Sequence, residues 1–135
     1  MTTATIATSP TATPTIPRTI AQRVNDLITY IQQGRVIDAM HEFYDRDVSM
    51  RENANPPSVG LDANIEREKK FLAQVKTWKG FTVTGLAVNG DTAFIENVIE
   101  FVSTDGRDVR LEQVSVQRWK NGRIVSERFY SNSGA

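Results

Sequence analysis

The chain has 135 residues, no cysteine and one histidine, and its 16 Lys and Arg residues balance 16 Asp and Glu residues. This length predicts one domain. Zero net charge argues against nucleic acid or an anionic membrane as a partner. With almost no thiol or imidazole, we expect neither a metal nor another cofactor. No apolar run approaches the roughly 18 residues that span a bilayer, and no basic residue precedes Arg18, so a cytoplasmic protein is expected.

Residues 1–18 are expected to form a flexible arm rich in Thr, Ala and Pro, and residues 19–135 to form the folded domain. Pro10, Pro14 and Pro17 block a helix in the arm, which also lacks a periodic apolar face.

Apolar residues then recur at helical spacing in three segments. The first covers 19–33, where Thr19 and Gln22 have the spacing of a capping box. The second covers 36–44. Asp62 is expected to cap a third helix, and its charged run from Glu66 to Lys70 is interpreted as a solvated face.

The remaining elements are strands. A short strand is predicted over 48–52, and from Phe81 the apolar period changes to two. Three turn signals, at Asn89-Gly90, Asp105-Gly106 and Asn121-Gly122, divide the rest into strands over 81–88, 92–103, 108–119 and 123–131. This order predicts an α+β domain with its helices on one side of the sheet.

Both faces of the long predicted strands are apolar. In 92–103, one face carries Ile95, Ile99 and Phe101, and the other carries Phe94, Val98 and Val102. The helices can cover one face, and the economical cover for the other is a second copy of the chain, so a homodimer is expected. The alternative is a monomer whose arm or third helix wraps this second face.

Four segments carry a family resemblance: Gln32-Gln33-Gly34, the run FYDRDVSMREN at 43–53, Gly60-Leu61-Asp62-Ala63, and WKNGRI at 119–124. Through them the chain resembles the SnoaL-like group of the nuclear transport factor 2-like superfamily, which includes ketosteroid isomerases, limonene epoxide hydrolases and polyketide cyclases. The resemblance implies a conical fold, with three helices packed on the concave face of a strongly curved mixed or antiparallel sheet. It also implies a pocket for a small apolar molecule but does not specify a reaction.

The resemblance marks Glu52 as a candidate catalytic residue, because it falls where ketosteroid isomerases hold the carboxylate that moves the substrate proton. Leu27 and Ser115 stand where those isomerases place a tyrosine and a protonated aspartic acid, so steroid isomerisation of that type is not expected. The alternative for Glu52 is a solvated residue at a strand end.

Which residues line the pocket depends on strand register, because a slip of one residue exchanges the two faces. The family geometry favours three-residue loops at the last two turns. The expected lining is then Leu27, Ile95, Asn97, Ile99, Phe101, Leu111, Gln113, Ser115 and Phe129, with Glu127 as a second candidate catalytic carboxylate. Alternatively, Asn97 and Gln113 bond only to each other, and Glu127 pairs with Arg128 or Arg110.

Two classes of function remain open from the sequence. In the first, Glu52 is the general base of a cofactor-independent isomerase, cyclase or hydrolase that acts on an apolar carbonyl- or epoxide-bearing compound. Asn97, Gln113 and Ser115 would orient that compound. In the second, the domain is a non-catalytic ligand-binding or dimerisation module, which the missing tyrosine and aspartic acid favour.

Deletion of residues 1–17 is expected to leave the fold intact, because this segment adds no periodic apolar face to a core. Melting temperatures of the truncated and full chains, measured by circular dichroism, should agree within a few degrees. A large drop would show that the segment is a packed or exchanged element.

Overall fold

The computed structural model describes residues 18–132, so the predicted arm lies almost entirely outside the described residues. The helices are α1 (Ile20–Gln32), α2 (Val36–Phe43) and α3 (Leu61–Leu72). The strands are β1 (Tyr44–Glu52), β2 (Ser58–Val59), β3 (Val75–Asn89), β4 (Thr92–Ser103), β5 (Asp108–Lys120) and β6 (Arg123–Ser131). No helix within this range is both long and apolar enough to cross a membrane.

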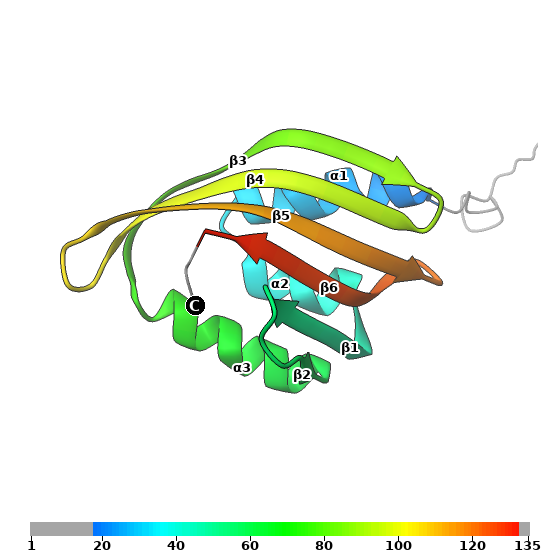
Figure 1. The fold of residues 1–135 in the computed structure, drawn as a ribbon, viewed down its shortest axis with the longest axis horizontal. Coiled ribbons are helices and arrows are strands. Elements are labelled where there is room, and N and C mark those ends of the chain that lie inside the picture. The colour runs from blue at the N-terminus through cyan, green and yellow to red at the C-terminus, as the bar shows by residue number, and fades with distance from the viewer. Residues whose placement is uncertain (1–17, 133–135) are drawn as a thin grey trace, which may run out of the picture.

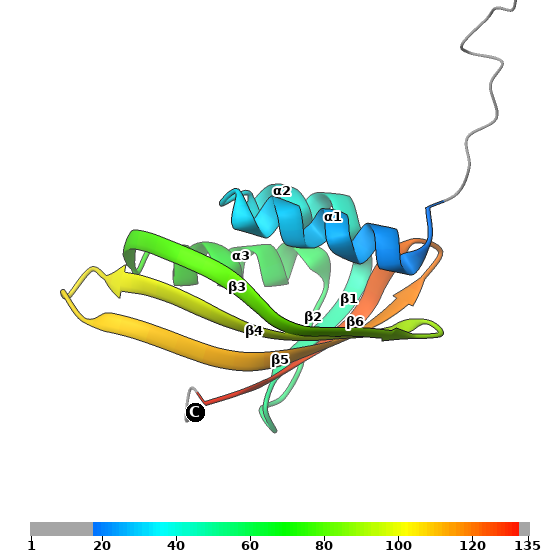
Figure 2. The ribbon, with the colours of Figure 1, turned by 90° about the horizontal axis from the view of Figure 1, so that it is seen from above.

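The strands form one mixed sheet in the order β2-β1-β6-β5-β4-β3. β1 runs parallel to β6, and every other neighbouring pair is antiparallel. The three helices lie on one side of the sheet, which bends around them (Figures 1 and 2). The predicted α+β architecture, with helices on the concave face of a curved sheet, is therefore confirmed.

Two strands are longer than the sequence predicted. β1 begins at Tyr44 rather than at 48, and β3 begins at Val75 rather than at 81. Irregularities in the pairing of β3 with β4 lie between Val75 and Thr77 and between Trp78 and Gly80. Such bulges interrupt the alternation of apolar and polar residues, which hides a strand from a pattern of period two.

The start of α3 also differs from the prediction. Gly60, with φ 101°, is the N-cap, so the helix begins at Leu61 and Asp62 lies within its first turn. The Asn64 side chain donates to the carbonyl oxygens of Ser58 (3.0 Å) and Gly60 (2.8 Å) and joins the helix to β2. Asp62 still suits this end of the helix, because a negative charge is favourable near the exposed N–H groups.

The last two turns reach the predicted faces by different routes. A backbone hydrogen bond joins Ser103 to Arg107, and the three residues between them, 104–106, form a β4–β5 loop of the expected length. The β5–β6 turn has only two, Asn121 and Gly122, both at positive φ. The pairing of β5 with β6 shifts by one residue between Arg118 and Trp119. This shift has the same effect on the register as a third loop residue, so Ser115 pairs with Phe129 as expected.

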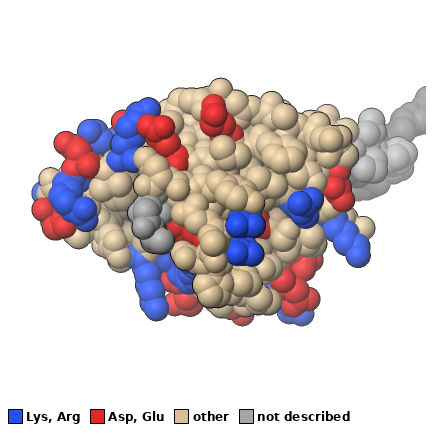
Figure 3. Space-filling view, in the orientation of Figure 1, with Lys and Arg blue, Asp and Glu red and all other residues tan. Residues whose placement is uncertain are grey.

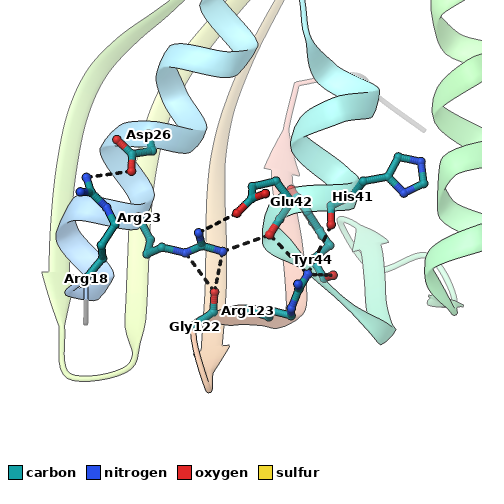
Figure 4. Close-up of polar contacts among 8 residues, drawn as sticks. All are labelled: Arg18, Arg23, Asp26, His41, Glu42, Tyr44, Gly122 and Arg123. Atoms are coloured by element: carbon teal, nitrogen blue, oxygen red, sulfur yellow. Dashed lines mark hydrogen bonds and ion pairs between the residues drawn. The ribbon is translucent and has the colours of Figure 1, made fainter. Parts of the chain in front are cut away.

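Two arginines hold the junction between α2 and β1 (Figure 4). Arg23 of α1 donates to the carbonyl oxygens of Glu42 and Gly122, both at 3.0 Å, and pairs with the Glu42 carboxylate. Arg123 donates to the carbonyls of His41, Glu42 and Tyr44. These donors satisfy carbonyls at the C-terminus of α2, where a positive charge is favourable. Their contacts determine where Tyr44, the first residue of β1, enters the sheet.

Candidate functional site

A cavity of about 580 Å³ lies between the helices and the concave face of the sheet. Its size is typical of small-molecule sites. All residues that the sequence proposed for the site line it: Leu27, Glu52, Ile95, Asn97, Ile99, Phe101, Leu111, Gln113, Ser115, Glu127 and Phe129. The walls are mostly apolar, and aromatic side chains of α3 and β3 add to them.

The buried acidic group of the cavity is the carboxyl of Glu127, a residue only 4% exposed. The hydroxyls of Tyr44 and Ser115 and the side-chain amide of Gln117 all donate hydrogen bonds to it, the amide at 2.8 Å. Trp119 donates to the Gln117 carbonyl oxygen at 3.2 Å, which orients that amide. Both carboxyl oxygens of Glu127 are therefore occupied.

Strand register brings these groups together. Gln117 of β5 pairs with Glu127 of β6, and Met50 of the parallel strand β1 pairs with Glu127 from the other side. Ser115 lies two residues before Gln117 and so shares its face of the sheet. The site therefore depends on the central strands of the sheet rather than on loops.

Burial raises the pKa of Glu127 above its usual range, and the hydrogen bonds from Ser115, Tyr44 and Gln117 oppose this rise. Burial and the nearby Glu127 charge in turn raise the pKa of Tyr44 well above its usual value, so this phenol stays a donor. Neither arginine that the sequence considered as a partner contacts Glu127. Arg110 pairs with Glu100 and Glu112, and Arg128 donates to the Asn53 carbonyl.

Two side-chain amides form a second polar group on the same face. Gln113 donates to the carbonyl oxygen of Asn97 at 3.1 Å, and Asn97 donates to the backbone carbonyl of Ile95 at 3.0 Å. The predicted bond between the two amides is thus present. Each side-chain amide nitrogen has two N–H groups, and each donates only one of them in these hydrogen bonds, so the other is available to a ligand.

Glu52 lies at the edge of the cavity, where its side chain is 44% exposed. Its carboxylate is 3.9 Å from the guanidinium of Arg67 in α3, at the limit of an ion pair. The position is compatible with exchange of protons with solvent.

The sequence analysis did not propose Tyr44, Gln117 or Glu68 for the site, although all three line the cavity. Five other polar residues that it did not propose also line the cavity: Arg51, Asn64, Arg67, Lys70 and Gln74. Gln117 follows Gln113 and Ser115 at a spacing of two residues, so the strand alternation could have placed it in the cavity. Glu68 was assigned to a solvated face of α3, but it stands four residues after Asn64 and three before Phe71, at the helical spacing of the inner face. Tyr44 had no comparable signal, because it was placed at a helix end.

Glu68 is partly exposed and lines the cavity from α3. Burial of its carboxyl and the charges of Glu127 and Glu52 together raise its pKa from 4.5 to about 7, and the charge of Arg67 opposes this rise. The cavity therefore contains a carboxyl group that changes its protonation near neutral pH. Within residues 18–132, no cluster of His, Asp and Glu side chains has the grouping of a metal site.

Comparisons with known proteins agree with this geometry. The family model described as "SnoaL-like domain" matches residues 24–127. A solved structure from Mesorhizobium loti, provisionally named a SnoaL-like polyketide cyclase, is 26% identical with a TM-score of 0.71, over 84% of this chain and 99% of that one. No curated protein matches the chain.

Two further solved structures share the fold. An NTF2-like protein of unknown function from Burkholderia pseudomallei has a TM-score of 0.74 at 16% identity, over 84% of this chain and 91% of that one. A protein from Bacillus subtilis, provisionally named an isomerase, has a TM-score of 0.70 at 19% identity, over 83% and 85%.

The substitution Glu127→Gln is expected to flatten the dependence of stability on pH. A carboxyl whose folded pKa is raised binds more protons in the folded state, so stability falls as pH rises from its unfolded value, about 4.3, to the raised folded value. The free energy of unfolding in urea, measured from pH 4 to 8, checks this slope.

Glu66→Gln is the matched control, because Glu66 is an exposed α3 residue whose side chain is 66% accessible. Its slope should equal that of the unmodified protein. Carbon-13 NMR of labelled glutamate gives the direct comparison, and titration of Glu127 near 4.3 would contradict the assignment of a desolvated carboxyl.

Proposed function

Because the chain belongs to the family of SnoaL-like domains, we propose that its cavity binds a small, mostly apolar compound with a carbonyl or epoxide oxygen. We further propose acid–base chemistry on that compound, of the isomerase, cyclase or hydrolase type and without a cofactor. One observation carries the proposal: a buried carboxyl with three fixed donors stands in an otherwise apolar cavity, beside an amide pair with unused N–H groups.

The polar groups divide into distinct roles under this proposal. Asn97 and Gln113 direct their second N–H groups to the ligand oxygen, where they stabilise developing negative charge. Glu127 is a fixed charge beside the reacting atoms. Glu52, at the cavity edge near Arg67, exchanges protons with solvent.

The similarity to the Mesorhizobium loti protein, provisionally named a polyketide cyclase, supports this reaction class. A non-catalytic ligand-binding module is the second candidate. It is favoured by the complete engagement of Glu127, whose oxygens already accept three hydrogen bonds.

Two probes of similar size test the proposal: benzylideneacetone, a ketone, and trans-stilbene oxide, an epoxide. At least one should raise the melting temperature of the protein. The variant Ile99→Trp, which fills the cavity, should remove that shift, whereas Val88→Trp, at an exposed position outside the cavity, should retain it.

Chromatography of the same mixtures separates the two candidates, because product indicates an enzyme and a shift without product indicates a binding module. Native mass spectrometry of protein purified without additives shows whether a cellular compound is retained. Absence of any retained compound, together with no shift from either probe, would contradict a small-molecule site.

We also propose that the outer face of the sheet forms a homodimer. No described helix covers this face (Figure 2), and charged side chains gather mainly toward its margins (Figure 3). Phe94 and Tyr130 are 40% and 46% exposed, and register places them beside Val116 and Val114. An apolar surface of this kind marks an interface.

Light scattering at micromolar concentration should give about twice the chain mass of 15.1 kDa. Val116→Glu places a charge within the outer face and is expected to reduce the mass to that of one chain. Leu86→Glu, an exposed residue that pairs with Ile95 and so belongs to the other face, is the control and should remain dimeric. A single-chain mass for the unmodified protein would refute the dimer.

A further inference from the structure

Glu68 differs from the other carboxyls of the cavity because it has no partner among residues 18–132. No hydrogen bond or ion pair within this range engages its carboxyl group. By contrast, Glu127 accepts three hydrogen bonds, and Glu52 lies near the guanidinium of Arg67. A carboxyl without a partner can bond to a molecule in the cavity without first breaking an existing contact.

Glu68 lines the same cavity as the polar groups of the sheet, and the charge of Glu127 reaches its carboxyl. α3 packs on β1 and α2, and the charged or titratable groups that line the cavity besides Glu68 are Glu127, Tyr44, Glu52, Arg51, Arg67 and Lys70. The parts of α1 and α2 that line the cavity supply only apolar side chains. A ligand held by Asn97 and Gln113 would therefore share the cavity with the carboxyl of Glu68.

We propose that Glu68 is the catalytic residue that exchanges a proton with the ligand, with Glu127 as the fixed neighbouring charge. This inference rests on the proposed function. In it, the Glu68 carboxylate takes a proton from a carbon next to the ligand carbonyl. The C–H electron pair becomes the carbon–carbon double bond of an enolate, and the charge moves to the oxygen held by the amides. For a ligand with a carbon–carbon double bond one carbon further along, the enolate is a dienolate. The Glu68 carboxyl then returns the proton to the far carbon of that double bond, so the carbonyl re-forms and the double bond moves next to it.

The electrostatics agree with this role. The pKa of about 7 leaves Glu68 divided between acid and base forms at neutral pH, which suits a group that both takes and returns a proton. Glu127 contributes to that value through its charge, so it tunes Glu68 without contacting the reacting proton. Glu68 thus has the accessibility that Glu127 lacks.

The experiment uses 5-nitro-1,2-benzisoxazole, an aromatic probe that reports a general base in an apolar cavity. The base removes the proton on the carbon of the C=N bond, and that electron pair forms the nitrile. The N–O bond breaks and its electrons remain on oxygen as a coloured phenolate. No oxidant or second reactant is needed, and absorbance gives kcat/KM.

The full chain should accelerate this reaction with a kcat/KM that rises with pH around a midpoint near 7. Glu68→Gln should lower kcat/KM by about 100-fold or more. Glu66→Gln, the exposed carboxyl on the same helix, should leave it unchanged. Glu127→Gln should move the midpoint to lower pH, because it removes a neighbouring negative charge.

Quenching of tryptophan fluorescence measures probe binding separately, since Trp78 lines the cavity. If the probe binds but Glu68→Gln retains the rate, or if Glu52→Gln removes it instead, the assignment of Glu68 is wrong while the ligand site stands. If the probe does not bind, the proposed site and this assignment both fail.

Carbon-13 NMR of the ligand-free protein provides a test that needs neither a variant nor a bound probe. The Glu68 signal, assigned by its absence in Glu68→Gln, should titrate near pH 7. Titration close to 4.5 would overturn the assignment even if the probe binds.

Discussion

The burial of one carboxyl group, that of Glu127, constrains the centre of this molecule. A carboxylate without water requires donors, and here they come from β1 through Tyr44 and from β5 through Ser115 and Gln117. β1 must therefore run beside β6 in a defined register. Loss of a donor would leave a buried polar group unsatisfied, which costs about 1–3 kcal/mol.

The same constraint links the fold to the chemistry that we propose. Arg23 and Arg123 hold the end of α2, so that Tyr44 enters β1 where its hydroxyl meets Glu127. When it is ionised, the Glu127 carboxyl raises the pKa of Glu68 of α3 through its charge. The Glu127 carboxyl therefore belongs both to the hydrogen bonds of the fold and to the proposed chemistry, because a charge acts over a longer distance in a low-dielectric interior than in water.

The sheet separates two kinds of surface by its alternation. Side chains of one parity on β4 and β5 line the cavity, and those of the other parity form the outer face, where Phe94, Val98, Val114 and Val116 lie among charged residues. A slip of one residue would exchange these surfaces. The one-residue shift before the Asn121-Gly122 turn, rather than the length of the loop, therefore determines which side chains line the cavity. The helices cover only the concave side (Figure 2).

The sequence alone determined the hairpin turns, the family resemblance and the order of all helices and strands except the two-residue β2, because periodicity and turn chemistry are local. It also identified the cavity lining on β4 to β6, since Asn97, Gln113 and Ser115 follow one alternation. Only the tertiary structure showed that Tyr44 and Gln117 share the Glu127 carboxyl and that Glu68 lines the same cavity. These groups lie on separate elements, so their meeting depends on the parallel pairing of β1 with β6 and on the packing of α3, and no local pattern records either.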